Sequence, residues 1–101
     1  MKLNKHVKAL WVEALRSGKY KQGRNSLRPS QNKFCCLGVL ADQICPLEWK
    51  GRDWQGHGVL LPPELAAEIN LSYKAETTLA DLNDDYGKSF NEIADYIEKK
   101  L

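Results

Sequence analysis

Apolar residues recur at helical spacing at both ends of the chain. A 3.6-residue period predicts an amphipathic helix over residues 3–17, with its apolar face formed by Leu3, Val7, Leu10, Trp11, Ala14 and Leu15. Gly18 should end this helix, because glycine adopts left-handed backbone conformations without a Cβ clash. Ser89 and Glu92 have the spacing of a capping box. They predict a last helix whose apolar face consists of Phe90, Ile93, Ala94, Ile97 and Leu101.

The middle of the chain contains three further helical patterns. Residues 34–41 are the most apolar run, and a buried helix over about 36–45 should stop at Pro46. Gly38 within it suggests a close packing contact. Pro62 and Pro63 open a helix over 63–70. The run Thr78–Asp81 has the form of a capping box and predicts a short helix to about residue 85.

Strand signals are confined to two short regions. Residues 19–36 resemble a hairpin. Tyr20 and Leu27 lie on one side of its turn signals, which are at 29–32 with a further signal at 25–26, and Phe34 lies on the other side. Glycines in the irregular segment 46–61 allow a second short hairpin. The predicted fold class is therefore α+β. We expect one small domain over residues 1–101, with about five mostly short helices packed on a small antiparallel sheet.

Composition narrows the class of protein. The 101 residues are 43% hydrophobic and 28% charged, which is typical of a folded domain with a single core. No run of 18 apolar residues could span a membrane, and residues 1–6 lack the apolar segment of a signal peptide. A cytoplasmic location is the expectation.

The net charge of +2 is unevenly divided along the sequence. Residues 1–33 contain nine Lys and Arg against one acid, a local charge of +8, whereas residues 34–101 contain six basic and twelve acidic residues, a local charge of −6. Such asymmetry can mark an anion-binding face or a surface that docks a second copy of the chain. Two separately solvated helices of opposite charge are the alternative.

Cysteine usage predicts a reducing compartment and no metal. Cys35, Cys36 and Cys45 form no CxxC pair, and with His57 they would reach four ligands only in an unusual arrangement. Small buried hydrophobic side chains are the favoured interpretation.

A calcium loop is also disfavoured. An EF-hand frame would take its ligands from Asp81, Asn83, Asp85 and Glu92. Tyr86 occupies the position that requires glycine, and Gly87 comes one residue too late. A helix end followed by a capping box accounts for the same residues. No cofactor is predicted.

No catalytic constellation is visible in the sequence. The two histidines are His6 and His57, and neither can be placed beside a nucleophile. The thiols of Cys35 and Cys36 lie in an apolar run, which should raise their pKa. Neither a GxSxG motif nor a P-loop is present. We therefore expect a protein that is not an enzyme.

Binding is the better-supported class of function. A strand over residues 19–24 would place Tyr20, Gln22 and Arg24 on one face, where the ring could stack on a base and the guanidinium could hold a phosphate. Trp49 and Trp54 could add a second stacking surface, with half-buried packing as the alternative. The candidate ligand-binding residues are Arg16, Lys19, Tyr20, Gln22, Arg24, Arg28, Trp49 and Trp54.

Several motifs together resemble a family of small proteins encoded by tailed phages and prophages. They are ALRSG at residues 14–18, FCCLGVL at 34–40, LND at 82–84, SF at 89–90 and IAD at 93–95. The resemblance covers nearly the whole chain. It brings no residue roles with it, but it implies an accessory protein that acts in a bacterial host cell.

The resemblance and the charge pattern together give three hypotheses. The first is a non-enzymatic binder, expected to form a homo-oligomer, that counters host defence by sequestering a small nucleotide signal. The alternative is an inhibitor that blocks a host defence protein through its basic face. The third is a DNA-associated protein, although a net charge of +2 is low for long nucleic acid.

Overall fold

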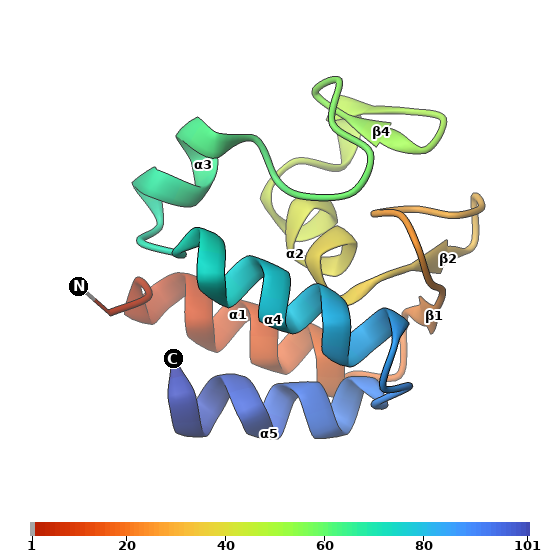
Figure 1. Ribbon diagram of the computed structural model, residues 1–101. Coiled ribbons are helices and arrows are strands. Elements are labelled where there is room, and N and C mark those ends of the chain that lie inside the picture. Colours follow the sequence, from red (N-terminus) through yellow and green to blue (C-terminus); the bar gives the residue numbers. More distant parts are fainter. Residues whose placement is uncertain (1) are drawn as a thin grey trace.

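Three helices of similar length lie alongside one another and carry the remaining elements (Figure 1). The structure is a computed structural model that describes residues 2–101. The three are α1 (Lys5–Arg16), α4 (Tyr73–Asp84) and α5 (Phe90–Lys100). α1 packs most extensively against α5, and α2 (Cys36–Ile44) packs against both α1 and α4. The shorter α3 (Pro63–Glu68) lies beside the start of α4.

The end of α1 and the start of α5 agree with the sequence-based prediction, whereas α1 begins at Lys5 and not at residue 3. The side chain of Asn4 caps α1 by accepting hydrogen bonds from the backbone N–H groups of His6 and Val7. Gly18, just beyond α1, has a φ of 76°, the left-handed conformation expected of a glycine stop. Ser89 and Glu92 form both hydrogen bonds of a capping box at the start of α5, which confirms that prediction.

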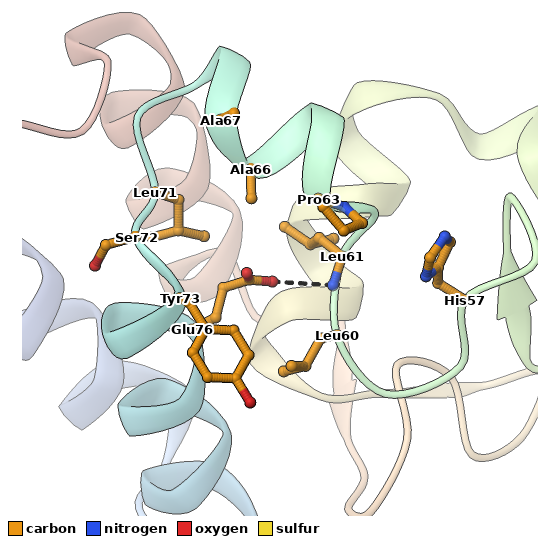
Figure 2. A pocket seen from close by; sticks show the side chains of 10 residues that line it. All are labelled: His57, Leu60, Leu61, Pro63, Ala66, Ala67, Leu71, Ser72, Tyr73 and Glu76. Atoms are coloured by element: carbon orange, nitrogen blue, oxygen red, sulfur yellow. Dashed lines mark hydrogen bonds between the residues drawn. The ribbon is translucent and has the colours of Figure 1, made fainter.

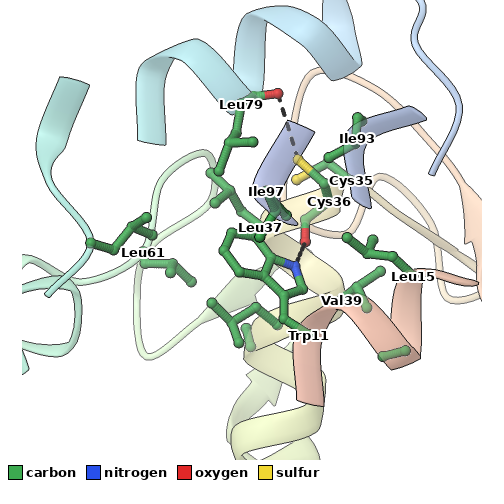
Figure 3. Packing of buried hydrophobic residues seen from close by; sticks show 14 of the residues in the cluster. Trp11, Leu15, Cys35, Cys36, Leu37, Val39, Leu61, Leu79, Ile93 and Ile97 are labelled. Carbon is green, nitrogen blue, oxygen red and sulfur yellow. Dashed lines mark hydrogen bonds between the residues drawn. The ribbon is translucent and has the colours of Figure 1, made fainter. Parts of the chain in front are cut away.

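α2 is the centre of the hydrophobic core. Six of its residues are buried, and Trp11 of α1 donates a hydrogen bond of 2.9 Å from its indole nitrogen to the carbonyl of Cys36. Leu37 and Leu79 are fully buried, and Leu79 of α4 lies near the thiol of Cys36 (Figure 3). A side chain on Gly38 would overlap the carbonyl oxygen of Leu27, so the predicted close contact is confirmed.

α4 begins earlier than the sequence predicts. The capping box at Thr78 is not formed, because Thr78 lies inside α4. The cap is Ser72, whose hydroxyl accepts the N–H of Ala75 at 3.0 Å. The prediction was wrong because the spacing of Thr78 and Asp81 matches a capping box, although both residues lie inside a helix that Ser72 already caps.

The predicted hairpin over residues 19–36 is also wrong in direction. β1 (Lys21–Gln22) and β2 (Lys33–Phe34) pair in parallel, with Lys21 opposite Lys33. Leu27 is fully buried between the two turn signals, and its N–H donates to the carbonyl of Gly58 at 2.6 Å. Since the chain reverses on each side of Leu27, two reversals leave the strands pointing the same way.

The second region of strand signals does form a hairpin. The 3-10 turn η1 (Pro46–Glu48) leads into β3 (Trp49–Lys50), which pairs antiparallel with β4 (Asp53–Trp54). Residues 2–101 thus form five helices and two separate two-stranded sheets, one parallel and one antiparallel. The α+β class is confirmed, while the single antiparallel sheet is replaced by two. No helix within the described residues is both long and apolar enough to cross a membrane.

Candidate anion-binding site

Tyr20 is fixed against α2 by two hydrogen bonds. Its hydroxyl donates to Oδ2 of Asp42 at 2.6 Å and accepts from the side-chain nitrogen of Gln43 at 2.7 Å. Burial, together with the hydrogen bond to Asp42, raises the pKa of Tyr20 to about 12. The ring meets Phe34 edge to face, with centroids 5.1 Å apart. Tyr20 is therefore a fixed support, and its hydroxyl is already committed within the chain.

Trp49 and Arg28 continue this row of rings. The indole nitrogen of Trp49 donates to Oδ1 of Asp42 at 3.0 Å, so one carboxylate holds both aromatic side chains. Trp49 also meets Phe34 at a centroid distance of 5.8 Å. The guanidinium carbon of Arg28 lies 5.1 Å from the centroid of the Trp49 ring, which is a cation–π contact. The chain therefore presents a guanidinium held in place on an indole.

The sequence around this contact is rich in positive charge. Residues 19–52 contain seven Lys and Arg but only two acids, Asp42 and Glu48. None of these seven cations makes a salt bridge with any residue in the described range 2–101. The parallel register places the exposed Lys21 and Lys33 opposite each other. Asp42 is occupied by the two rings, so this region has free positive charge.

The remaining basic candidates are separated from this contact. Arg16 bonds Asp95 and Glu98 of α5, both at 2.7 Å. Gln22 donates to the side chain of Asn83 and to the carbonyl of Lys88. Arg24 lies against Gly87, in the connection between α4 and α5, and Lys19 is exposed. The predicted shared face of Tyr20, Gln22 and Arg24 does not form, because β1 spans only two residues.

Trp54 does not offer a stacking surface in this structure. It is 2% exposed, and its indole nitrogen donates to the carbonyl of Cys45 at 2.9 Å. Trp54 is therefore a packing residue, whereas Trp49 is half-buried and contacts Arg28. Of the eight candidates, the fold brings together Tyr20, Arg28 and Trp49.

Two residues of this cluster had no role in the sequence-based prediction. Phe34 joins Tyr20 to Trp49, and Asp42 bonds both. The signal for Asp42 was present, since an acid within the apolar helix 36–44 needs a partner when it is partly buried. Its partners could not be named, because they lie on segments whose packing only the fold defines.

The cysteines have the environment of packing residues. Cys35 is 3% exposed and Cys36 is fully buried. Burial raises the pKa of Cys35 to about 12 and that of Cys36 well above its ordinary value. Neither thiol is therefore an available nucleophile at neutral pH.

The described residues do not form a metal site. No group of three or more His, Cys, Asp or Glu side chains within residues 2–101 is placed to hold an ion. The EF-hand frame is not formed, because Asp81 and Asn83 lie within α4 and Asn83 is fully buried.

The sequence places the chain in a family. Residues 3–60 match the model of a family described as a domain of unknown function, DUF8296, and the chain belongs to this family. The match covers α1 through β4, and so includes Tyr20, Arg28 and Trp49. No curated protein and no solved structure matches the chain.

Proposed function

We propose that this protein is a non-enzymatic binder that holds a small nucleotide on the surface around Arg28 and Trp49. The observation that carries the proposal is the guanidinium of Arg28, 5.1 Å above the Trp49 ring, among cations that have no acidic partner within residues 2–101. By holding a host nucleotide signal, the protein would counter host defence. The resemblance to small phage and prophage proteins supports that setting.

The chemistry of Arg28 suits a phosphate group. A guanidinium binds phosphate oxygens through a planar fork of N–H donors. Stacking on Trp49 restricts the side chain before a ligand arrives, which lowers the entropy lost on binding. The Nε atom of Arg28 is buried without a hydrogen-bond partner in the described residues. The side chain is thus oriented by the ring and not by an acid.

Neighbouring lysines support the same class of ligand. Lys21 and Lys33 are exposed and opposite each other in the parallel pair, and Lys50 follows Trp49 directly. A positive surface raises the local concentration of an anion and speeds its association. The half-buried ring of Trp49 adds an aromatic surface for a base.

Thermal melting with a panel of nucleotides tests the proposal. Cyclic dinucleotides, linear dinucleotides and ADP-ribose are added separately to the full chain. A ligand present at about 100 times its Kd should raise Tm by roughly 10 °C, because it binds only the folded state. Arg28→Gln should abolish that rise.

Arg16→Gln is the matched control. It removes the same charge from a residue that pairs with acids of α5 and does not contact Trp49. The rise in Tm with the nucleotide should remain in this variant. A panel without any rise in Tm would contradict the proposal, as would an unchanged rise in Arg28→Gln.

An exposed leucine favours a second candidate function. Leu47 is 91% exposed and lies two residues before Trp49. An exposed apolar side chain beside free cations is a typical feature of a protein-binding surface. The same face would then block an acidic patch on a host protein. Capture of one host protein that Leu47→Ser abolishes, without any nucleotide effect on Tm, would support this alternative.

The salt dependence of the affinity distinguishes DNA binding from nucleotide binding and from the blocking of a host protein. Affinity for duplex DNA should fall steeply as salt rises, because bound phosphates release counterions. A mobility-shift titration at several salt concentrations measures that slope.

A further inference from the structure

A cavity lies on a different part of the chain from the Arg28–Trp49 contact. It is formed by α3, the start of α4 and the segment from residue 57 to residue 61, and Figure 2 shows its lining. Its volume of about 490 Å³ falls in the range that holds small organic ligands. It shares no lining residue with the anion-binding candidate.

Most of the lining is apolar. Leu60, Leu61 and Leu71 contribute aliphatic surface, and Ala67 of α3 also lines the cavity. The ring of Tyr73 also lines the cavity, although the residue as a whole is 72% exposed. A ligand in this cavity would therefore need an apolar body.

One carboxylate interrupts this apolar lining. Glu76 extends from the first turn of α4 and is 3% exposed. Oε1 accepts the backbone N–H of Leu61 at 3.0 Å (Figure 2). Oε2 has no hydrogen-bond donor among residues 2–101. The carboxylate is thus held in one orientation, with half of its accepting capacity unused.

The charge of Glu76 has no partner within the described residues. It makes no salt bridge there, and neither Lys nor Arg is among the residues that line the cavity. His57 is the titratable side chain of the facing segment, and Tyr73 is that of α4 itself. Burial raises the pKa of Glu76, against the hydrogen bond from Leu61. A buried carboxylate in this setting is costly unless a proton or a cation joins it.

We propose that this cavity binds a small organic cation, an amine with an apolar body. The ammonium group pairs with Glu76, and the body lies against Leu60, Leu61 and Leu71. The ring of Tyr73 lies at the side of the cavity and adds an aromatic face for the cation. This site is separate from the proposed nucleotide site, because none of Tyr20, Arg28 and Trp49 lines the cavity.

A purely structural role for Glu76 predicts a different outcome. If Glu76 only bonded the N–H of Leu61 before Pro62, a glutamine would serve equally well, because its amide oxygen accepts the same hydrogen bond. Glu76→Gln therefore removes the charge while it keeps the acceptor and the size. Binding of an amine distinguishes the two roles.

The experiment is an NMR titration of the ¹⁵N-labelled full chain at neutral pH. The probes are phenethylamine, its neutral analogue 2-phenylethanol and the anion 3-phenylpropionate. We expect phenethylamine to shift the Leu61 amide saturably and to bind at least about tenfold more tightly than the alcohol, because a charge-assisted hydrogen bond is worth that ratio or more. The anion should not bind. Glu76→Gln should lose the preference for the amine.

Two further variants complete the test. Glu68→Gln removes a charge from the exposed face of α3, outside the cavity lining, and should leave amine binding unchanged. Ala67→Trp should block the cavity from an exposed position while Glu76 stays in place, so it tests the site even if Glu76→Gln does not fold. The proposal is overturned by equal binding of amine and alcohol, by no saturable shift, or by full amine binding in Ala67→Trp.

Discussion

Asn83 has no exposed surface, yet both polar atoms of its side chain are fully bonded. Oδ1 accepts from Gln22 at 2.9 Å and from the backbone N–H of Cys36 at 3.2 Å. Nδ2 donates to the carbonyl of Gly23 and to Asp84, both at 2.8 Å. One amide therefore ties the β1 segment and the first residue of α2 to α4. These four hydrogen bonds require a side chain with both a donor and an acceptor, which explains why asparagine fits and aspartate would not.

Loss of this amide should be costly. We expect Asn83→Ala to lower the free energy of unfolding by about 2–4 kcal/mol, because the Cys36 N–H and the Gly23 carbonyl lose a buried partner. Urea denaturation of the purified variant measures the change. Asn91→Ala, at an exposed position of α5, is the control and should stay within about 0.5 kcal/mol of the wild type. A difference of similar size for both variants would contradict this role for Asn83.

The raised pKa of Tyr20 predicts a loss of stability at alkaline pH. Its pKa is raised from 10.0 to about 12 in the folded chain, so the neutral hydroxyl is favoured by folding. The corresponding stabilisation is complete below pH 10 and is lost as the pH rises toward 12. Ultraviolet titration of the phenolate should contain a late component that Tyr20→Phe lacks. If the titration curves of the two proteins lack such a difference, the hydrogen bond to Asp42 does not persist in solution.

At the scale of elements, the position of α2 depends on a glycine. Gly38 lets the helix approach the backbone of Leu27 so closely that a Cβ atom would overlap its carbonyl oxygen. Leu27 in turn bonds Gly58 and Cys35 through its backbone, so the loop before β2, α2 and the segment after β4 are packed as a unit.

Gly38→Ala tests that contact. The added methyl group has no free space, and the atom it meets belongs to the backbone. We expect a loss of about 2 kcal/mol or more, even though alanine has the higher helix propensity by about 1 kcal/mol. Differential scanning calorimetry should show a clearly lowered Tm. Gly51→Ala is the comparison for a glycine in open space, where only its φ of 59° opposes the substitution. A rise in Tm for Gly38→Ala would show that the loop can move away at little cost.

At the scale of the whole molecule, the opposed charges of the sequence meet within one chain. Arg16 of α1 bonds Asp95 and Glu98 of α5, and Lys8 donates to the carbonyl of Glu98. The basic first helix and the acidic last helix are thus packed together. Within residues 2–101, the cations of residues 19–52 take no part in these ion pairs.

This arrangement predicts how the size of the particle depends on salt. Because α1 and α5 pair their charges internally, pairing between copies through these two helices is not needed. We expect the mass measured by light scattering to be the same in low and high salt, although screening shortens the range of charges to about 10 Å at 0.1 M. A mass that falls as salt is raised would instead show that the two helices join separate chains.

Local patterns in the sequence were sufficient for much of the fold. The period of apolar residues and the caps at Gly18 and Ser89 identified α1 and α5, and the apolar run before Pro46 identified α2. These features depend on contacts between residues that are near in sequence. The start of α4 was misplaced, because the spacing of Thr78 and Asp81 matches a capping box, although Ser72 is the true cap.

In the candidate site, too, the sequence indicated the residue types, whereas the fold determined which of them lie together. The sequence alone identified Tyr20, Arg28 and Trp49 as suitable residue types, but it grouped them with Gln22 and Trp54, which the fold uses elsewhere. It could not show that Asp42 holds two of the rings, or that Glu76 faces an apolar cavity. What the sequence by itself determined was which segments become helices and where the charge resides. Only the tertiary structure decided the direction of β2, the neighbours of each ring and the burial of each carboxylate, because those depend on contacts between distant segments.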